Sequence, residues 1–152
     1  MEINTISSFD DMNQFLSNFA ISPVNVFGKT FRTAEHAYQF AKTNDPEWQE
    51  EILKARSPGK AKRLGQKCPV KSNWEDIKFE VMEAIVRIKF SNPWFQNQLL
   101  QTGDKILVEG NTWHDNYWGD CSCEQCKKNV GKNNLGKILM DIRSAMQPSN
   151  KE

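Results

Sequence analysis

One stripe of a predicted helix carries a carboxylate, an amide and an amine. Glu35, Gln39 and Lys42 are spaced by four and three residues, which places their side chains on one helical face. In a sugar-processing enzyme the carboxylate could stabilise an oxocarbenium-like cation or activate water, and the amine could bind a phosphate or attack a sugar aldehyde. Taken alone, the same spacing is more often an ordinary solvated face.

The histidines limit the kinds of metal site that the chain can build. His36 and His114 are the two histidines of the sequence, so a multi-histidine centre is excluded. His36 stands beside Glu35, where a single histidine is more often a structural hydrogen-bonding residue than a ligand.

A second candidate segment, residues 111–136, combines aromatic, acidic, cysteine and glycine residues just before a predicted helix. Its aromatic rings could stack on a flat ligand, and the backbone amides at the start of the helix could bind phosphate. A long surface loop held together by its aromatic residues explains the composition equally well.

Three cysteines in this segment have the pattern C-x-C-x2-C: Cys121, Cys123 and Cys126. Thiolate zinc sites commonly take four ligands, so the fourth would have to be His114 or the distant Cys68. No second C-x2-C pair is present. We therefore favour three reduced thiols in an insertion over a zinc site.

Helix signals dominate the elements that must position these residues. Thr33 caps a helix through residue 41, and the pairs Asp45-Pro46 and Ser57-Pro58 each open another. The third of these helices is expected to end at Gly65 in a left-handed cap. Further helices are expected from residue 72 or 73, from Pro93, and over residues 134–146.

The longest of these helices shows a helical spacing of aliphatic residues, which predicts its buried face as Ile77, Val81, Ala84, Ile85 and Ile88. Short strands are expected at residues 23–27 and 105–109. The elements predict a predominantly α-helical α+β fold, without the strand–helix alternation of a doubly wound sheet.

Size and charge narrow the class of protein. The 152 residues suit one domain, expected over residues 1–147 with a loose tail at 148–152. A net charge of +1 argues against a strongly basic protein that coats duplex nucleic acid. No apolar run reaches the length of a membrane span and the amino terminus lacks an export signal, so we expect a cytoplasmic protein that does not bind membranes.

Eight short motifs occur in order along the chain. They are LSNF (residues 16–19), FGKTFRTAEHAYQFAK (27–42), SPGKAKRLG (57–65), NWE (73–75), KF (89–90), LVE (107–109), DNYWG (115–119) and GKNNLGKILMDIR (131–143). Together they resemble the NADAR family, also called YbiA-like, of NAD- and ADP-ribose-associated proteins, over nearly the whole chain.

The resemblance implies the NADAR fold and hydrolysis of N-ribosyl bonds, with no required cofactor and no obligate protein partner. The favoured substrate is ADP-ribosylated guanine in nucleic acid, and the alternative is a phosphoribosylamino-pyrimidine intermediate of riboflavin synthesis. A module that binds ADP-ribose or NAD without turnover is a further alternative, which the pairing of Glu35 with Lys42 disfavours.

The resemblance also assigns site residues. The implied catalytic residues are Glu35, Lys42 and Asp115. The implied substrate-binding residues are Asn18, His36, Gln39, Trp74, Tyr117, Trp118, Gly119 and Arg143. Trp74 and Trp118 would hold the base or the ribose, and Asp115 would bind the ribose or protonate the leaving nitrogen. The cysteine insertion after Asp120 departs from the simpler family pattern of a short glycine-rich turn.

Overall fold

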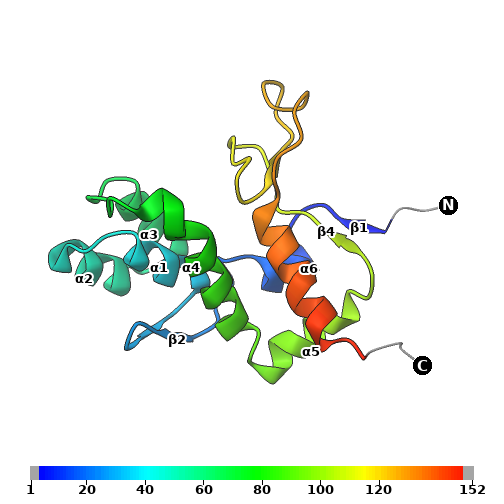
Figure 1. Ribbon diagram of the computed structural model, residues 1–152, viewed down its shortest axis with the longest axis horizontal. Helices are drawn as coiled ribbons and strands as arrows, with labels where there is room; N and C mark the ends of the chain where they lie inside the picture. The colour runs from blue at the N-terminus through cyan, green and yellow to red at the C-terminus, as the bar shows by residue number, and fades with distance from the viewer. Residues whose placement is uncertain (1–3, 149–152) are drawn as a thin grey trace. The chain divides into compact units, whose positions relative to one another are not determined.

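The computed structural model describes residues 4–148, which divide into two compact units (Figure 1). Residues 4–17 and 92–148 form unit 1, and residues 18–91 form unit 2. The predicted tail lies outside the described residues from position 149 on. Within residues 4–148, no helix combines the length and the apolar character needed to span a bilayer. The predominantly helical α+β fold is confirmed.

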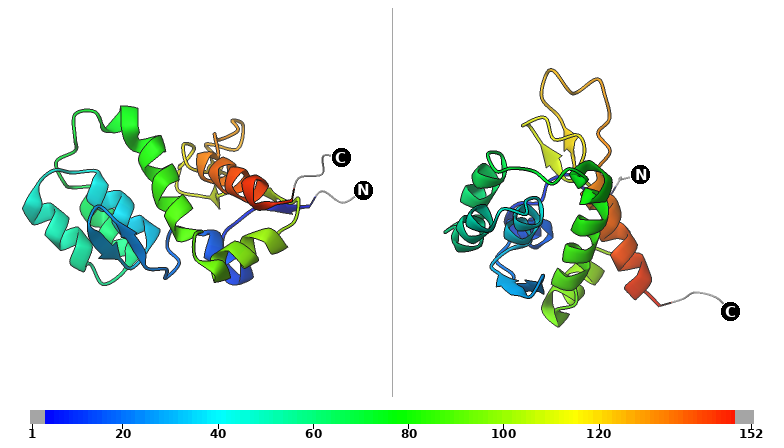
Figure 2. Two further views of the ribbon diagram at one scale, coloured as in Figure 1. Left: turned by 60° about the horizontal axis from the view of Figure 1, so that its bottom comes forward. Right: turned by 60° about the vertical axis from the view of Figure 1, so that its left-hand side comes forward.

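Unit 2 begins with an antiparallel hairpin of β2 (Val24–Val26) and β3 (Lys29–Phe31). The strand predicted at residues 23–27 ends at Val26, because Phe27 and Gly28 form the turn with φ of 56° and 71°. Two successive positive φ angles are what a type I′ turn requires. The hairpin packs against the first helix of the unit, α1 (Figure 2).

The helices of unit 2 begin where local capping predicts. They are α1 (Ala34–Ala41), α2 (Pro46–Lys54), α3 (Pro58–Gly65) and α4 (Trp74–Lys89). The side chains of Thr33, Asp45 and Ser57 accept hydrogen bonds from backbone N–H groups in the first turns of α1, α2 and α3. Helix α1 packs against the other three helices and is buried at every position, so it forms the centre of the unit.

Gly65 does not form the predicted left-handed cap. It is the last residue of α3 and lies outside the positive-φ region, and Gln66 ends the helix in a right-handed conformation. Glycine is required for a different reason: a Cβ at this position would overlap the side-chain amide of Gln39 on α1. The requirement is close packing between helices, which local sequence does not reveal.

The predicted buried face of α4 is displaced around the helix. The buried side chains are Trp74, Met82, Ile85, Val86 and Lys89, so Ile85 is the only predicted residue among them. Ala84 is exposed. The aliphatic Val86 belongs to the face but was not in the predicted set, and counting only aliphatic residues also left out Met82 and the apolar stem of Lys89. The Lys89 Nζ lies 5.1 Å from the centroid of the Phe90 ring.

Unit 1 is built around its C-terminal helix. Its elements are β1 (Thr5–Ile6), the 3-10 helix η1 (Asp11–Leu16), α5 (Pro93–Gln101), β4 (Ile106–Leu107), β5 (Gly110–Asn111), β6 (Asp120–Cys121) and α6 (Asn134–Met146). Strand β4 pairs in parallel with β1, and β5 pairs in parallel with β6. Helix α6 packs against β4 and α5. The strand predicted at 105–109 is reduced to β4, and the predicted helix 134–146 is confirmed.

Replacing Gly65 by alanine should destabilise the protein, because the new methyl group must displace the buried amide of Gln39. We expect a loss of about 1–3 kcal/mol in the free energy of unfolding, measured by urea denaturation. Gly59→Ala on the same helix is the matched control, since its Cβ would meet no atom closer than 3.6 Å. Equal stability of the two variants would contradict the packing argument.

Candidate functional site

Helix α1 buries the carboxylate of the predicted catalytic stripe. Glu35 is 8% exposed and Gln39 is 6% exposed. The Gln39 Nε2 donates a hydrogen bond of 2.6 Å to Glu35 Oε2. Glu35 and Gln39 therefore do share one helical face, and that face is not the solvated surface that the spacing alone favoured.

The backbone of Glu35 is held by Asn18. The Glu35 N–H donates to the Asn18 carbonyl oxygen at 3.0 Å, while the Asn18 Nδ2 lies 3.3 Å from the Met82 sulfur. Asn18, predicted to line the substrate pocket, is buried and anchors the first turn of α1. The contacts that the structure gives it make it a positioning residue for Glu35.

The oxygen of the Gln39 amide, unlike its nitrogen, forms no hydrogen bond within residues 4–148. Gln39 Oε1 is buried and finds no donor among residues 4–148. Leaving a buried acceptor unsatisfied costs about 1–3 kcal/mol, so the position favours a donor that the protein itself does not supply. A water molecule or a ligand hydroxyl has the required chemistry.

Lys42 directly follows α1 and keeps helical backbone angles of −70° and −23°. The stripe therefore continues to Lys42, about 10 Å along the helix axis from Glu35. Lys42 is partly exposed, which suits a group that meets an anionic ligand. Burial raises the pKa of the nearby Cys68 thiol, and the charge of Lys42 partly opposes that shift.

His36 lies beside the stripe with both ring nitrogens engaged. Its Nδ1 is 2.7 Å from Thr33 Oγ1 and its Nε2 is 3.0 Å from the Ala55 carbonyl oxygen. The carbonyl requires a proton on Nε2, so Nδ1 accepts from the threonine hydroxyl. Burial lowers the pKa of His36. These contacts support the structural interpretation of His36 and leave no free ring nitrogen for the predicted substrate contact.

Trp74, the predicted stacking residue of unit 2, is 4% exposed. Its ring packs against Tyr38 of α1 with centroids 5.1 Å apart and planes tilted by 54°. The indole is therefore largely covered, and Tyr38 of α1 provides part of that cover.

In unit 1 the DNYWG motif, residues 115–119, forms a tight turn. One carboxylate oxygen of Asp115 accepts from the N–H groups of Tyr117 at 3.2 Å and Trp118 at 2.9 Å. The rings of Tyr117 and Trp118 meet edge to face with centroids 4.7 Å apart, and both residues are half-buried. Asp115 thus shapes the turn that presents the two aromatic side chains.

The carbonyl groups of this turn occupy the amides at the start of α6. Asn134 N donates to the Tyr117 oxygen at 3.2 Å, and Leu135 N donates to the Trp118 oxygen at 3.0 Å. The idea that these amides bind phosphate is therefore wrong for both residues. Gly119 is buried, and a Cβ there would overlap the Glu109 carbonyl oxygen, so close packing requires glycine at this position.

Arg143 lies at the other end of α6, about 13 Å along the axis from Asn134. Its Nη1 donates to Thr102 Oγ1 at 2.8 Å, and burial lowers its pKa. The structure therefore does not bring Arg143 to the DNYWG turn; it fastens α6 to the end of α5.

Two asparagines that the sequence analysis did not single out hold this part of unit 1. Asn133 has a φ of 52°, and its side-chain amide bonds the Leu107 carbonyl and the Glu109 N–H. Asn111 Oδ1 accepts from the N–H groups of Trp113 and Asp115. The available signal was that asparagine tolerates left-handed backbone and bonds nearby main chain.

The same loop gathers its cysteines around a histidine. The donor atoms of His114, Cys121, Cys123 and Cys126 all lie within 4.8 Å of one another. The sequence offered His114 or Cys68 as the fourth ligand, and the structure places His114 beside the three cysteines. Desolvation and the adjacent thiols of Cys121 and Cys123 raise the pKa of Cys126 to about 11.

Comparisons with known proteins agree over most of the chain. A family model described as the NADAR domain matches residues 6–147. N-glycosidase YbiA of Escherichia coli (strain K12) is 40% identical over 147 residues, which cover 95% of this chain and 88% of the relative. The NMR structure of the E. coli protein YbiA has a TM-score of 0.76 at 37% identity, covering 96% of this chain and 87% of that one.

Longer proteins also contain a similar region. A riboflavin biosynthesis protein of Vibrio vulnificus is 38% identical over 141 residues, which cover 91% of this chain but 37% of the relative. The chloroplastic riboflavin biosynthesis protein PYRR of Zea mays is 32% identical over 163 residues, which cover 25% of its length.

The buried histidine predicts a loss of stability on acidification. Because burial lowers the folded-state pKa of His36, the unfolded chain takes up a proton first as the pH falls below about 6.5. The contribution of neutral His36 to the free energy of unfolding is complete above that pH. Below it, the contribution declines by at most about 1.4 kcal/mol per pH unit. Urea denaturation between pH 7.5 and 5.5 should show this slope, and His36→Gln should flatten it. If His36→Gln kept the same dependence of unfolding free energy on pH, a group other than His36 would be responsible for it.

Proposed function

Because the chain belongs to the NADAR family, we propose that it is an N-glycosidase, a hydrolase that cleaves the bond between a ribose C1′ and a nitrogen atom. The observation that carries this proposal is the buried carboxylate of Glu35, held by Gln39 on the face that continues to Lys42. The printed name of the E. coli relative, N-glycosidase YbiA, supports the same reaction class.

The charge of Glu35 suits the transition state of this reaction. Departure of the nitrogen builds positive charge at C1′ and the ring oxygen, as in other glycoside cleavages. A carboxylate stabilises that charge more strongly when it is shielded from water and already oriented. Glu35 meets both conditions because it is 8% exposed and Gln39 fixes one of its oxygens.

The reaction consumes one water molecule. The water oxygen bonds to C1′, the C1′–N bond breaks with its electron pair left on nitrogen, and the proton released by the water ends on that nitrogen. Glu35 orients the water and stabilises the cation. For Lys42 two roles stay open: it binds a phosphate or ribose oxygen, or it forms a Schiff base with the ring-opened sugar.

Two substrates with this bond follow from the family. ADP-ribosylated guanine in nucleic acid is the substrate predicted from the resemblance. A phosphoribosylamino-pyrimidine has the additional support that relatives from Vibrio vulnificus and Zea mays are named as riboflavin biosynthesis proteins. Both substrates present an N-linked ribose with phosphate, so one carboxylate chemistry serves either.

Replacing Glu35 by glutamine should leave the fold intact and lower kcat by about 10³-fold, because the side-chain shape is kept while the charge is lost. The assay follows release of free ADP-ribose from guanine-ADP-ribosylated DNA and, in parallel, release of the sugar from the aminopyrimidine substrate. Circular dichroism and thermal unfolding verify that the variant is folded.

Glu47→Gln is the matched control for this test. Glu47 holds the same second position in α2 that Glu35 holds in α1, but its side chain is exposed. Full activity of Glu35→Gln on the substrate that the parent protein cleaves would contradict the proposed mechanism. Measurable ADP-ribose binding with no turnover of either substrate would favour a binding module over an enzyme.

A further inference from the structure

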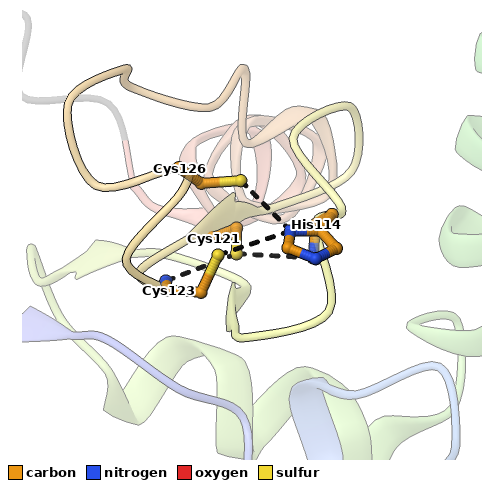
Figure 3. A group of neighbouring side chains, drawn as sticks. All are labelled: His114, Cys121, Cys123 and Cys126. Carbon is orange, nitrogen blue, oxygen red and sulfur yellow. Dashed lines mark hydrogen bonds between the residues drawn. The ribbon is translucent and has the colours of Figure 1, made fainter.

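The loop between β5 and β6, strand β6 and the segment that follows it gather three cysteine sulfur atoms and one imidazole within 4.8 Å of one another (Figure 3). His114 Nδ1 lies 3.3 Å from Cys123 Sγ and 3.4 Å from Cys126 Sγ. We propose that His114, Cys121, Cys123 and Cys126 bind a structural Zn²⁺ ion that holds the DNYWG turn in place. This inference does not depend on the proposed glycosidase activity.

Hydrogen bonding between the side chains does not account for the arrangement. A neutral imidazole nitrogen carries either one proton or one lone pair, so Nδ1 forms one good hydrogen bond and not two of similar length. Zinc–sulfur and zinc–nitrogen bond lengths in a tetrahedral site place N and S ligand atoms about 3.6 Å apart and two S atoms about 3.8 Å apart. The two Nδ1–Sγ distances fall near the first value.

The backbone conformation directs the four side chains inward. His114 has a φ of 70°, an uncommon angle for a residue that is not glycine. Cys121 is set by the pairing of β6 with Asn111. Cys123 and Cys126 lie on one turn, in which the Cys126 N–H donates to the Cys123 carbonyl oxygen at 3.0 Å.

The sulfur of Cys121 already receives the hydrogen bonds that a metal-bound thiolate needs. The N–H groups of His114 and Cys123 point to it at 3.3 Å and 3.5 Å. Such outer contacts orient ligands and compensate the negative charge of a thiolate. Three sulfur ligands and one imidazole favour zinc over magnesium or calcium, and a complete set of four ligands is typical of a structural site.

The loop needs such a cross-link because it has no hydrophobic core. Among residues 112–132, only Gly119 and Cys121 are buried. The apolar side chains of Trp113 and Val130 are 57% and 91% exposed. A metal ion can supply the ordering that apolar burial does not. Because His114 directly precedes Asp115, fixing its ring also fixes the start of the turn that presents Tyr117 and Trp118.

Metal analysis of the full chain, expressed without an affinity tag and purified without chelator, tests the site. We expect one zinc per chain. His114→Asn keeps a residue that tolerates positive φ but removes the imidazole, and it should weaken zinc binding by at least about 100-fold in competition with a chromophoric chelator. Cys123→Ser should have a similar effect. Cys68→Ser, which removes the cysteine outside the cluster, should keep full zinc content.

A second measurement does not depend on the variants. Co²⁺ taken up by the chelated protein should give the intense visible absorption of tetrahedral thiolate coordination, and Zn²⁺ should displace it. Chelation should also speed trypsin cleavage after Lys127 or Lys128 by at least about 10-fold, since metal binding is linked to loop order. Folded parent protein that takes up neither Zn²⁺ nor Co²⁺ would overturn the proposal. Bound iron in place of zinc, or zinc retained by His114→Asn and Cys123→Ser, would also overturn it.

Discussion

A carboxylate can be buried only when the surrounding structure compensates the loss of water around its charge. In unit 2, Glu35 imposes this requirement, and the neighbouring elements meet it in part. The residue lies in the first turn of α1, where the helix dipole favours a negative charge, and Gln39 donates a charge-assisted hydrogen bond. Gly65 leaves the space that Gln39 needs, and Asn18 holds the backbone. Glu35 and Gln39 are thus buried on a helix that packs against three other helices.

In unit 1, the DNYWG turn is held by backbone and asparagine contacts. The carbonyl groups of residues 117–119 cap the start of α6, and Asn133 ties that point to Leu107 and Glu109. The DNYWG turn is therefore fastened to a helix on one side, while the cysteine-bearing loop on its other side has little buried surface. The proposed contact of Tyr117 and Trp118 with substrate would use this combination, because such side chains must be held in place without being covered.

Local signals predicted the parts of the fold that depend on neighbouring residues. The caps Thr33, Asp45 and Ser57 were correct because a side-chain oxygen and nearby N–H groups determine them. The family assignment made from eight motifs in order is confirmed by the NADAR family model and by the relatives. Helix α3 does end at Gly65 as predicted. The left-handed cap at Gly65 and the buried face of α4 were wrong because contacts between helices decide them. For the site, the shared face of Glu35 and Gln39 followed from spacing. The burial of that face became visible only in the folded structure. The same holds for the position of His114, and not Cys68, beside the three loop cysteines.

The junction at the base of the cysteine-bearing loop allows the loop to change in length. Gly131 N donates to Asp120 Oδ1 at 2.9 Å, and a Cβ on Gly131 would overlap the Gly119 carbonyl oxygen, so the chain leaves and re-enters the fold at nearly the same point. An insertion or deletion that changes the length of the loop at residues 122–130 would then change the loop-closure entropy only a little. A loop of this length and a short turn would both fit such a junction, so the loop can differ in length while helix α6 and its cap stay as they are.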